Sequence, residues 1–453
     1  MSYSNLEEKI QDAENPVTML RSQEVGSVKF PNVPDEWTNW REEQRAWRES
    51  CALADQSYHM TDLLIEGPDA IDLLSQLGVN SFDGFRPGKA KQLVVCSPNG
   101  YMIGDGILFY LDEDSLLLVG GPAAPNWVEY HITTGEEDVT CERLGYSRFD
   151  QLAGANAHPE HFRFQIQGPD ALTVMEEATG GSLPDIAFFH FESVEIAGTT
   201  VQALRHGMAG ESGFELWGPY SEKEGVRDAL LHVGESYEMR QLGRKSYQTT
   251  PVIVGWVPLP LPAVYGDDTS DYRQWLDAES YEGIASLGGS YLADDISSYY
   301  LRPNEVGYER LISFDHEFIG RKALEQSMSE QHRQLVTLDW KGEDVVDIFA
   351  SLFREETTSK YMDFPAPRSA AIQYDEVRSE NELIGVSKWI GYTFNERKML
   401  SLATIDSQMS TPGTEVTIIW GEKGQPRNRK IGHHRQTEIR ATVEPVPYIS
   451  DRR

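Results

Sequence analysis

Two stretches of the chain repeat one pattern, and this internal repeat limits the possible folds more than any other feature. The segments 63–66 and 164–167 are each followed by Gly-Pro-Asp-Ala, at 67–70 and 168–171, and corresponding residues stand 101 positions apart. Each copy has a largely apolar segment, a turn, and then apolar residues at helical spacing. We therefore expect a strand, a tight turn and a helix with proline at its first position in each copy, as in a duplicated half-domain.

Short alternating segments follow each copy and predict sheets. They lie at 92–96, 107–110 and 115–120 after the first copy, and at 193–197, 200–205 and 213–217 after the second. Strands in such succession favour an α+β fold with antiparallel sheets over an alternating βαβ fold. If each half contributes one sheet, a ligand is expected between the halves.

The rest of the chain divides into helices, a loop and a final β region. A short helix is expected before residue 25, and another over 39–53, where Trp40 and Trp47 share a packing face. The segment 243–265 is rich in proline and predicts a long ordered loop. After a polar stretch at 325–333, alternating segments at 335–338, 370–373, 384–389, 400–405 and 415–420 predict a barrel or jelly roll. The expected domains are 1–330, with halves of about 25–150 and 151–330, and 331–453.

Composition excludes several classes of partner. Forty Lys and Arg against 72 Asp and Glu give a net charge of −32, which repels nucleic acid and anionic membranes. The acidity is explained either by a high-salt cytoplasm, which we favour, or by a chance drift of the composition toward acidic residues. The three cysteines lack CxxC spacing, and His433 and His434 lack further ligands at metal-site spacing, so no metal is expected. Without a leader or membrane span, we expect a cytoplasmic protein, monomeric or homodimeric.

A glycine-rich segment from Arg205 to Trp217 indicates a ligand-binding loop. Gly207, Gly210 and Gly213 recur every three residues and allow the backbone to approach a ligand closely. The following strand carries Glu215 between hydrophobic residues. Its carboxylate is either solvated or a half-buried acceptor for N–H groups of a ligand.

This segment resembles a known signature. Arg-x-Gly-x-x-Gly-Glu-x-Gly-Phe-Glu is similar to the folate-domain motif of the glycine-cleavage T-protein (aminomethyltransferase) family. The segments 39–48, 55–60, 103–107, 204–210, 258–265 and 314–321 resemble one branch of it, the tetrahydrofolate-dependent aryl O-demethylases that act on vanillate and 3-O-methylgallate. The likeness extends from about Leu20 to Tyr448. It implies a T-protein-like folate-binding domain of two duplicated αβ halves and a C-terminal β-barrel domain.

The resemblance also implies a cofactor site for tetrahydrofolate, the methyl acceptor. Glu215 would accept hydrogen bonds from the pterin ring, and Gln165 would line the same site. Trp256 would form a wall for the pterin or the substrate ring, although core packing accounts for it nearly as well. Lys245 would meet the glutamyl carboxylates of the cofactor, although a solvated lysine is an equal alternative.

A methyl donor and an acid complete the expected reaction. The resemblance places the catalytic tyrosine of the demethylases at Tyr247, whose hydroxyl matches the pKa of about 10 of a leaving phenol. Gln56 and His59 match residues that line the aryl-ether pocket, and both can hydrogen-bond a phenol without a fixed charge. A structural role for His59 is the alternative.

Three positions depart from the family. Phe30 replaces an expected tyrosine, and Gly121 replaces an expected arginine that would bind the carboxylate of an aromatic acid. Gly104 replaces one acid of an acidic pair of the aminomethyltransferases, and we expect the remaining acid, Asp105, to form a turn. The loss at Gly104 counts against glycine cleavage, whereas Phe30 and Gly121 leave the methyl donor open.

The predicted function is therefore transfer of a methyl group from a small methoxy-aromatic compound, vanillate-like, to N5 of tetrahydrofolate. Demethylation of dimethylsulfoniopropionate at the same folate site is one alternative. A folate-binding protein without turnover is another.

Overall fold

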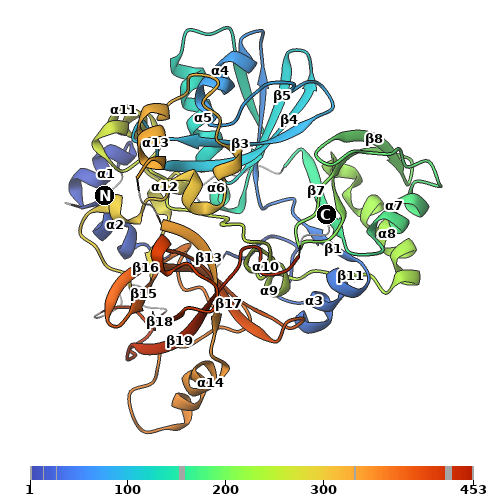
Figure 1. Ribbon diagram of the computed structural model, residues 1–453. Helices are drawn as coiled ribbons and strands as arrows, with labels where there is room; N and C mark the ends of the chain where they lie inside the picture. Colours follow the sequence, from blue (N-terminus) through green and yellow to red (C-terminus); the bar gives the residue numbers. More distant parts are fainter. Residues whose placement is uncertain are drawn as a thin grey trace.

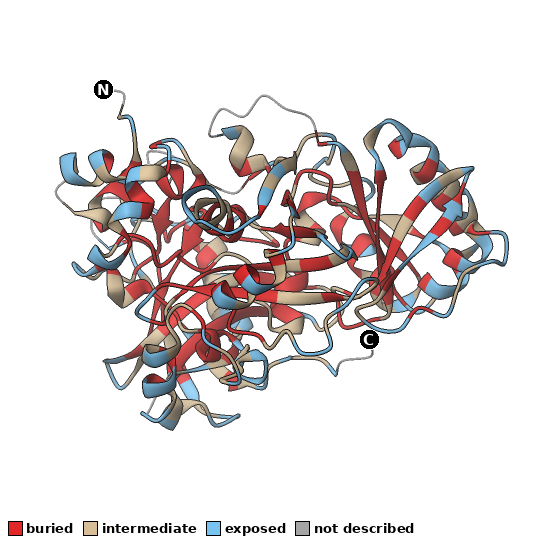
Figure 2. Cartoon of the chain, turned by 90° about the horizontal axis from the view of Figure 1, so that it is seen from above, coloured by how far each residue is buried: buried red, intermediate tan, exposed pale blue. Residues whose placement is uncertain are grey.

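The computed structural model describes residues 3–13, 15–26, 28–152, 159–330, 333–423 and 431–450. The described chain forms two open sheets and a closed barrel, with helices packed around them (Figure 1). Buried residues fill the interior of each of these three parts, and exposed residues lie on the outer faces of the helices (Figure 2). The expected α+β class with antiparallel sheets is confirmed.

The first sheet follows the first copy of the repeat. Its strand order is β3 (Ala90–Cys96), β4 (Met102–Asp112), β5 (Ser115–Gly120), β2 (Thr61–Glu66) and β6 (Thr140–Gly145), with antiparallel neighbours throughout. Helices α4 (Ala70–Leu77) and α5 (Ala123–Thr134) contribute to the core beside it. Leu63, Leu74 and Leu118 are among the fully buried side chains of this core.

The second sheet follows the second copy. Its order is β11 (Arg240–Gln241), β1 (Ala52–Asp55), β7 (His161–Gln167), β10 (Gly213–Pro219), β9 (Thr199–Arg205) and β8 (Phe191–Ile196). Helices α7 (Ala171–Ala178) and α8 (Lys223–Gly234) share its apolar core. Strand β1 precedes the first copy in the chain but pairs antiparallel with β7, so the two halves interlock.

The repeat forms the predicted strand and helix in both copies, but the expected position of proline was wrong. Helix α4 begins at Ala70 and α7 at Ala171, so Pro68 and Pro169 precede the helices. The amide of Ala70 donates to the carbonyl of Gly67, which places Pro68 at the second position of a β-turn. The fixed φ of proline suits that position.

The C-terminal region contains a closed six-stranded barrel. Its order is β13 (Arg333–Trp340), β17 (Lys398–Asp406), β16 (Glu382–Thr393), β15 (Asp375–Ser379), β18 (Glu415–Trp420) and β19 (Thr437–Glu444), and helix α14 (Gly342–Ala350) follows β13. The expectation that 370–373 belongs to the barrel was wrong. Strand β14 (Ile372–Gln373) instead pairs parallel with β12 (Leu287–Gly288), because the amide of Ile372 donates to the carbonyl of Ser286. Strands β15 and β19 were not predicted.

Further helices surround these sheets. The N-terminal region has two short helices where one was expected, α1 (Leu6–Asp12) and α2 (Pro16–Ser22). Helix α3 (Trp40–Glu49) begins after the N-cap Asn39 and buries Trp40 and Trp47 as predicted. Helices α6 (Arg148–Leu152), α11 (Ser270–Trp275), α12 (Tyr281–Ile284) and α13 (Arg321–Met328) complete the set outside the proline-rich segment, together with short 3₁₀ turns.

The proline-rich segment is more regular than expected. It contains α9 (Arg244–Tyr247) and α10 (Thr250–Val254), so the prediction of a loop throughout 243–265 was wrong. Pro251 lies in the first turn of α10, where no backbone N–H is needed. The later prolines do not lie in the first turn of a helix, and they prevent helix formation from residue 255 to residue 265.

Candidate active site

A cavity of about 420 Å³ lies where the two sheets, the proline-rich segment and the barrel meet. Strand β4 and the end of β5 form one wall, β10 and the loop before it form another, and α9 and α10 lie beside β16 of the barrel. Seven of the nine predicted site residues line it. They are Phe30, Gln56, His59, Gly121, Glu215, Tyr247 and Trp256.

Tyr247 stands at the end of α9 inside an aromatic and polar cluster. Its ring meets the His59 ring edge-on, with centroids 4.6 Å apart, and His59 stacks on Phe30 at 3.6 Å and 12°. The Gln56 side-chain amide donates to the Tyr247 hydroxyl at 2.9 Å. The tyrosine hydroxyl therefore has a fixed hydrogen-bond donor on one side while it faces the cavity.

Burial sets the protonation of this cluster. It raises the pKa of Tyr247 well above the ordinary value of 10, although the Gln56 hydrogen bond opposes the rise. Burial also lowers the pKa of His59 to about 4. At neutral pH the tyrosine is therefore a protonated acid beside a neutral imidazole, and His59 Nδ1 has no hydrogen-bond partner among the described residues.

Glu215 lines the opposite wall on β10 and belongs to a buried ion-pair group. Arg163, on the neighbouring strand β7, binds Glu215 through one guanidinium nitrogen and Asp62 of β2 through the other, at 2.5 and 3.2 Å. Burial raises the pKa of Glu215, whereas the guanidinium favours its charged form. The arginine therefore connects the two sheets at the cavity wall.

Gln165 and Lys245 do not line the cavity. Gln165 pairs in register with Glu215, and its amide donates to the carbonyl of His206 at 2.9 Å, so it supports the glycine-rich loop. Its Oε1 is buried without a hydrogen-bond partner among the described residues. Lys245 forms an ion pair with Glu36 at 2.8 Å, on the partly exposed side of α9.

Asp105 lies in strand β4, which corrects the expectation that it forms a turn. Residues 104–107 pair antiparallel with β3, after a register shift that leaves Ile103 without a partner in the ladder. Asp105 faces the cavity and accepts a hydrogen bond from the Tyr308 hydroxyl at 2.7 Å and another from Gln92. Trp256 donates to the same Tyr308 hydroxyl at 3.0 Å. Burial raises the pKa of Asp105 to about 6.

Several residues that line the cavity or support its wall were not found from the sequence. Arg163 occurs in the buried segment Phe-Arg-Phe, and a charge between buried aromatic residues could have indicated an internal ion pair. Arg368 and Trp389 come from the barrel region, more than 100 residues beyond the predicted site. No local pattern connects them to it.

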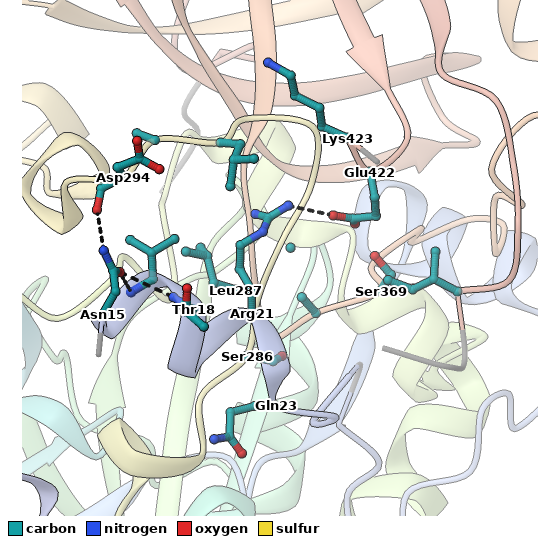
Figure 3. Close-up of a pocket in the computed structure, with 16 residues that line it drawn as sticks. Asn15, Thr18, Arg21, Gln23, Ser286, Leu287, Asp294, Ser369, Glu422 and Lys423 are labelled. Carbon is teal, nitrogen blue, oxygen red and sulfur yellow. Dashed lines mark hydrogen bonds and ion pairs between the residues drawn. The ribbon is translucent and has the colours of Figure 1, made fainter. Parts of the chain in front are cut away.

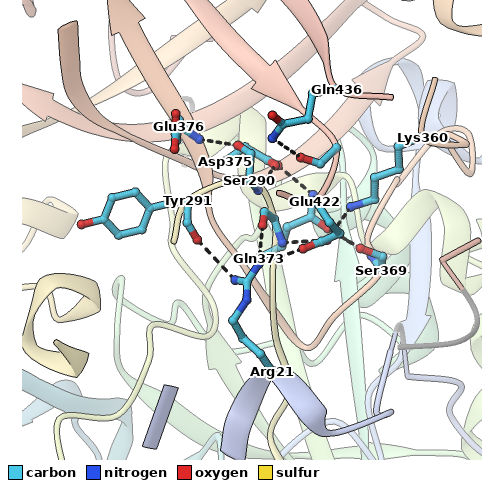
Figure 4. A network of polar contacts seen from close by, with 12 residues as sticks. Arg21, Ser290, Tyr291, Lys360, Ser369, Gln373, Asp375, Glu376, Glu422 and Gln436 are labelled. Atoms are coloured by element: carbon cyan, nitrogen blue, oxygen red, sulfur yellow. Dashed lines mark hydrogen bonds and ion pairs between the residues drawn. The ribbon is translucent and has the colours of Figure 1, made fainter. Parts of the chain in front are cut away.

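A second, smaller cavity of about 170 Å³ lies between α2 and the barrel (Figure 3). Its arginine, Arg21, is already paired with Glu422 at 3.0 Å, and Glu422 also binds Lys360 at 3.0 Å (Figure 4). These charges satisfy one another and hold α2 on the barrel. Across the described residues we find no group of three His, Cys, Asp or Glu side chains arranged for a metal, and no helix with the length and apolarity to cross a membrane.

Comparisons with known proteins agree on one family. Residues 20–252 match the family described as GCVT N-terminal domain. The chain is 43% identical to a syringate O-demethylase from Sphingobium sp., over 98% of this chain and 96% of that protein. It is 29% identical to a sesamin methylene transferase from Sinomonas sp., over 93% and 92% of the two chains. The crystal structure of the glycine cleavage aminomethyltransferase T from Bartonella henselae shares the fold, with a TM-score of 0.63 at 16% identity over 96% of this chain and 98% of that one.

Proposed function

The chain belongs to the glycine-cleavage T-protein family, and we propose that it is a tetrahydrofolate-dependent O-demethylase of methoxy-aromatic compounds. Two of its relatives are a syringate O-demethylase and a sesamin methylene transferase. The observation that carries the proposal is the buried, protonated Tyr247 hydroxyl, which shares one cavity with the Glu215 carboxylate.

The residues present fit a folate. Glu215 offers a carboxylate acceptor at the wall, and Oε1 of Gln56, which has no hydrogen-bond partner among the described residues, is a further buried acceptor in the same cavity. A planar heteroaromatic ring with several N–H groups would satisfy such acceptors. Gly207 lines the cavity without a side chain, so backbone can reach the ligand there. Glu215, Trp256 and Gln56 would hold the cofactor ring.

When bound, tetrahydrofolate would supply the N5 nitrogen that accepts the methyl group, and the proton lost from N5 would balance the proton that Tyr247 gives up. Tyr247 donates its hydroxyl proton to the aryl oxygen as the O–CH₃ bond breaks, so the product leaves as a neutral phenol. Gln56 donates a hydrogen bond to the tyrosine oxygen and stabilises the negative charge that remains there. His59 and Phe30 form the aromatic wall against which a methoxy-aromatic ring would stack.

The chemistry of the cavity favours an aryl ether over a sulfonium donor. A sulfonium leaves as a neutral thioether and needs no acid, whereas this cavity holds a protonated tyrosine with its own hydrogen-bond donor. The cavity also contains a guanidinium, Arg368, which would repel a cationic donor.

The test is anaerobic incubation with tetrahydrofolate in molar salt, read as 5-methyltetrahydrofolate formed. The donors would be vanillate, syringate, 3-O-methylgallate, guaiacol and dimethylsulfoniopropionate. We expect product with a methoxy-aromatic donor and a roughly 10²- to 10⁴-fold lower kcat in Tyr247→Phe, the usual worth of a general acid. Tetrahydrofolate binding should survive in this variant, because the phenyl ring keeps the His59 contact.

Tyr110→Phe is the matched control. Its hydroxyl makes one hydrogen bond, to the carbonyl of Glu113, at the exposed end of β4, so this change should leave kcat unaltered. Product only with the sulfonium donor would overturn the aryl ether proposal. Folate binding without methyl transfer from any donor would indicate a binding protein.

A further inference from the structure

Arg368 is a cation in the cavity without an anionic partner. It lines the 420 Å³ cavity of the candidate active site, and its guanidinium carbon lies 3.8 Å from the centroid of the Trp389 ring. Within the described ranges, no carboxylate lies at ion-pair distance from Arg368, and its buried Nε has no hydrogen-bond partner. A guanidinium removed from water in this way is costly unless a ligand supplies the missing charge.

Two other buried arginines near the cavity are neutralised by the protein itself. Arg163 binds Asp62 and Glu215, and Arg244 binds Asp35 at 2.8 Å. Neither of the two acids that line the cavity forms an ion pair with Arg368. Glu215 is paired with Arg163, and Asp105 accepts a hydrogen bond from the Tyr308 hydroxyl. Burial, with the nearby charge of Arg244, lowers the pKa of Arg368 to about 9, so it remains a cation at neutral pH.

The barrel holds this guanidinium in place. Trp389 interrupts the ladder between β16 and β17 at a bulge and has a left-handed backbone with φ of 43°. Its indole N–H donates to the carbonyl of Gln248 at 3.0 Å, next to Tyr247. Bulges and left-handed non-glycine residues concentrate at functional sites. The ring on which Arg368 stacks is therefore fixed to the same segment that carries Tyr247.

We propose that Arg368 binds the carboxylate of the aromatic methyl donor in place of the expected arginine that Gly121 replaces, and so determines the preference for a methoxybenzoic acid over a neutral methoxyphenol. This inference rests on the proposed function and adds the residue that selects the donor. A planar guanidinium pairs with a carboxylate through two parallel hydrogen bonds, and its stacking on Trp389 leaves its edge free for them. The glutamyl tail of the folate carries the same chemical group and is the competing source of the carboxylate.

The test compares a methoxybenzoic acid with its carboxamide, which has the same shape and no charge. We expect the wild-type protein to prefer the acid, and Arg368→Gln to lower kcat/KM for the acid roughly 10- to 100-fold, the worth of a charge-assisted hydrogen bond. The same variant should leave kcat/KM for the carboxamide within about twofold. Arg368→Lys should retain part of the preference, because the charge remains without the bidentate geometry.

A binding measurement separates this inference from the function itself. Calorimetric titration with the demethylated acid, without folate, should show binding to the wild-type protein that is weakened by a similar factor in Arg368→Gln. Arg354→Gln is the control, since this exposed arginine pairs with Asp347 and does not line the cavity.

Each outcome decides between the possibilities. If the wild-type protein transfers methyl groups but Arg368→Gln lowers acid and carboxamide rates equally, the carboxylate contact is overturned while the function stands. If instead KM for tetrahydrofolate rises and acid binding is unchanged, the arginine serves the glutamyl tail and the inference is wrong. If no donor reacts with the wild-type protein, the proposed function fails, whatever the titration gives.

Discussion

At the scale of single residues, Asp105 makes the stability of the protein depend on pH. Its ordinary pKa of 3.8 is raised to about 6 by burial in β4. The folded carboxyl therefore holds its proton more tightly than the unfolded one, so its contribution to stability is complete below about pH 4. That contribution is lost as the pH rises through 6, and the loss is about 3 kcal/mol at pH 7.

We expect Asp105→Asn to remove this pH-dependent contribution to the free energy of unfolding. The free energy of unfolding of the variant, relative to wild type, should rise by about 2–3 kcal/mol between pH 4 and pH 7, measured by urea denaturation. Asp339→Asn is the comparison, because that carboxylate is paired with Lys398 on the barrel and lies outside the cavity. A difference between Asp105→Asn and wild type that stays constant with pH would contradict the raised pKa.

How far the sequence predicts the site differs between residues. Tyr247, Gln56 and His59 were predicted because the segments that contain them resemble those of the demethylases, and the structure brings all three to one cavity. Arg368 could not be found in this way, since its partner ring Trp389 reaches the cavity only through a bulge in a barrel strand. Asp105 was assigned to a turn because Gly-Asp-Gly is typical of turns, whereas pairing with β3 overrides that local preference.

At the scale of elements, the start of β10 determines where Glu215 lies. Gly213 pairs with Gln167 across the ladder, and a Cβ on Gly213 would lie 2.3 Å from the carbonyl oxygen of Ile166. That atom is backbone and cannot move without shifting the strand. Gly213→Ala should therefore separate β10 from β7, lower the free energy of unfolding by about 1–3 kcal/mol, and weaken tetrahydrofolate binding.

Gly225→Ala is the matched control for this change. Gly225 lies inside α8, where a Cβ would meet no atom within 4 Å, so alanine should stabilise the helix by up to about 1 kcal/mol. Urea denaturation and folate titration of both variants would distinguish the two glycines. Unchanged stability and folate affinity in Gly213→Ala would show that the strand tolerates the methyl group.

The same scale shows what patterns in the sequence can predict. The two copies of the repeat predicted β2, α4, β7 and α7, because apolar spacing and turn residues agree there. The barrel strand β15 was missed because Val377 is its one apolar residue, whereas β19 alternates Ile439, Ala441 and Val443 with polar residues and could have been predicted. The pairing of β1 with β7 depends on contacts more than 100 residues apart, which no local pattern encodes.

At the scale of the whole molecule, the net charge of −32 acts against compactness. Exposed acids gather in two triplets close together on the first sheet, since the Gly67 amide donates to the carbonyl of Asp114 and the Gly67 Cα packs near the backbone of Asp138. The triplets are Asp112, Glu113 and Asp114, and Glu136, Glu137 and Asp138. The buried ion pairs of Glu422 with Arg21 and Lys360 are screened little by added salt (Figure 4).

We therefore expect added NaCl to stabilise the protein through the exposed acids. Screening shortens the Debye length from about 10 Å at 0.1 M to about 3 Å at 1 M, which relieves repulsion on the surface and leaves buried pairs largely unaffected. Tm, followed by circular dichroism, should rise by roughly 2–5 °C, mostly below 1 M. A variant with Asp112→Asn, Asp114→Asn, Glu136→Gln and Glu137→Gln should have a higher Tm in low salt and a smaller rise. A Tm that is independent of salt, or equal slopes in both proteins, would show that the acidity is not an adaptation to a high-salt environment.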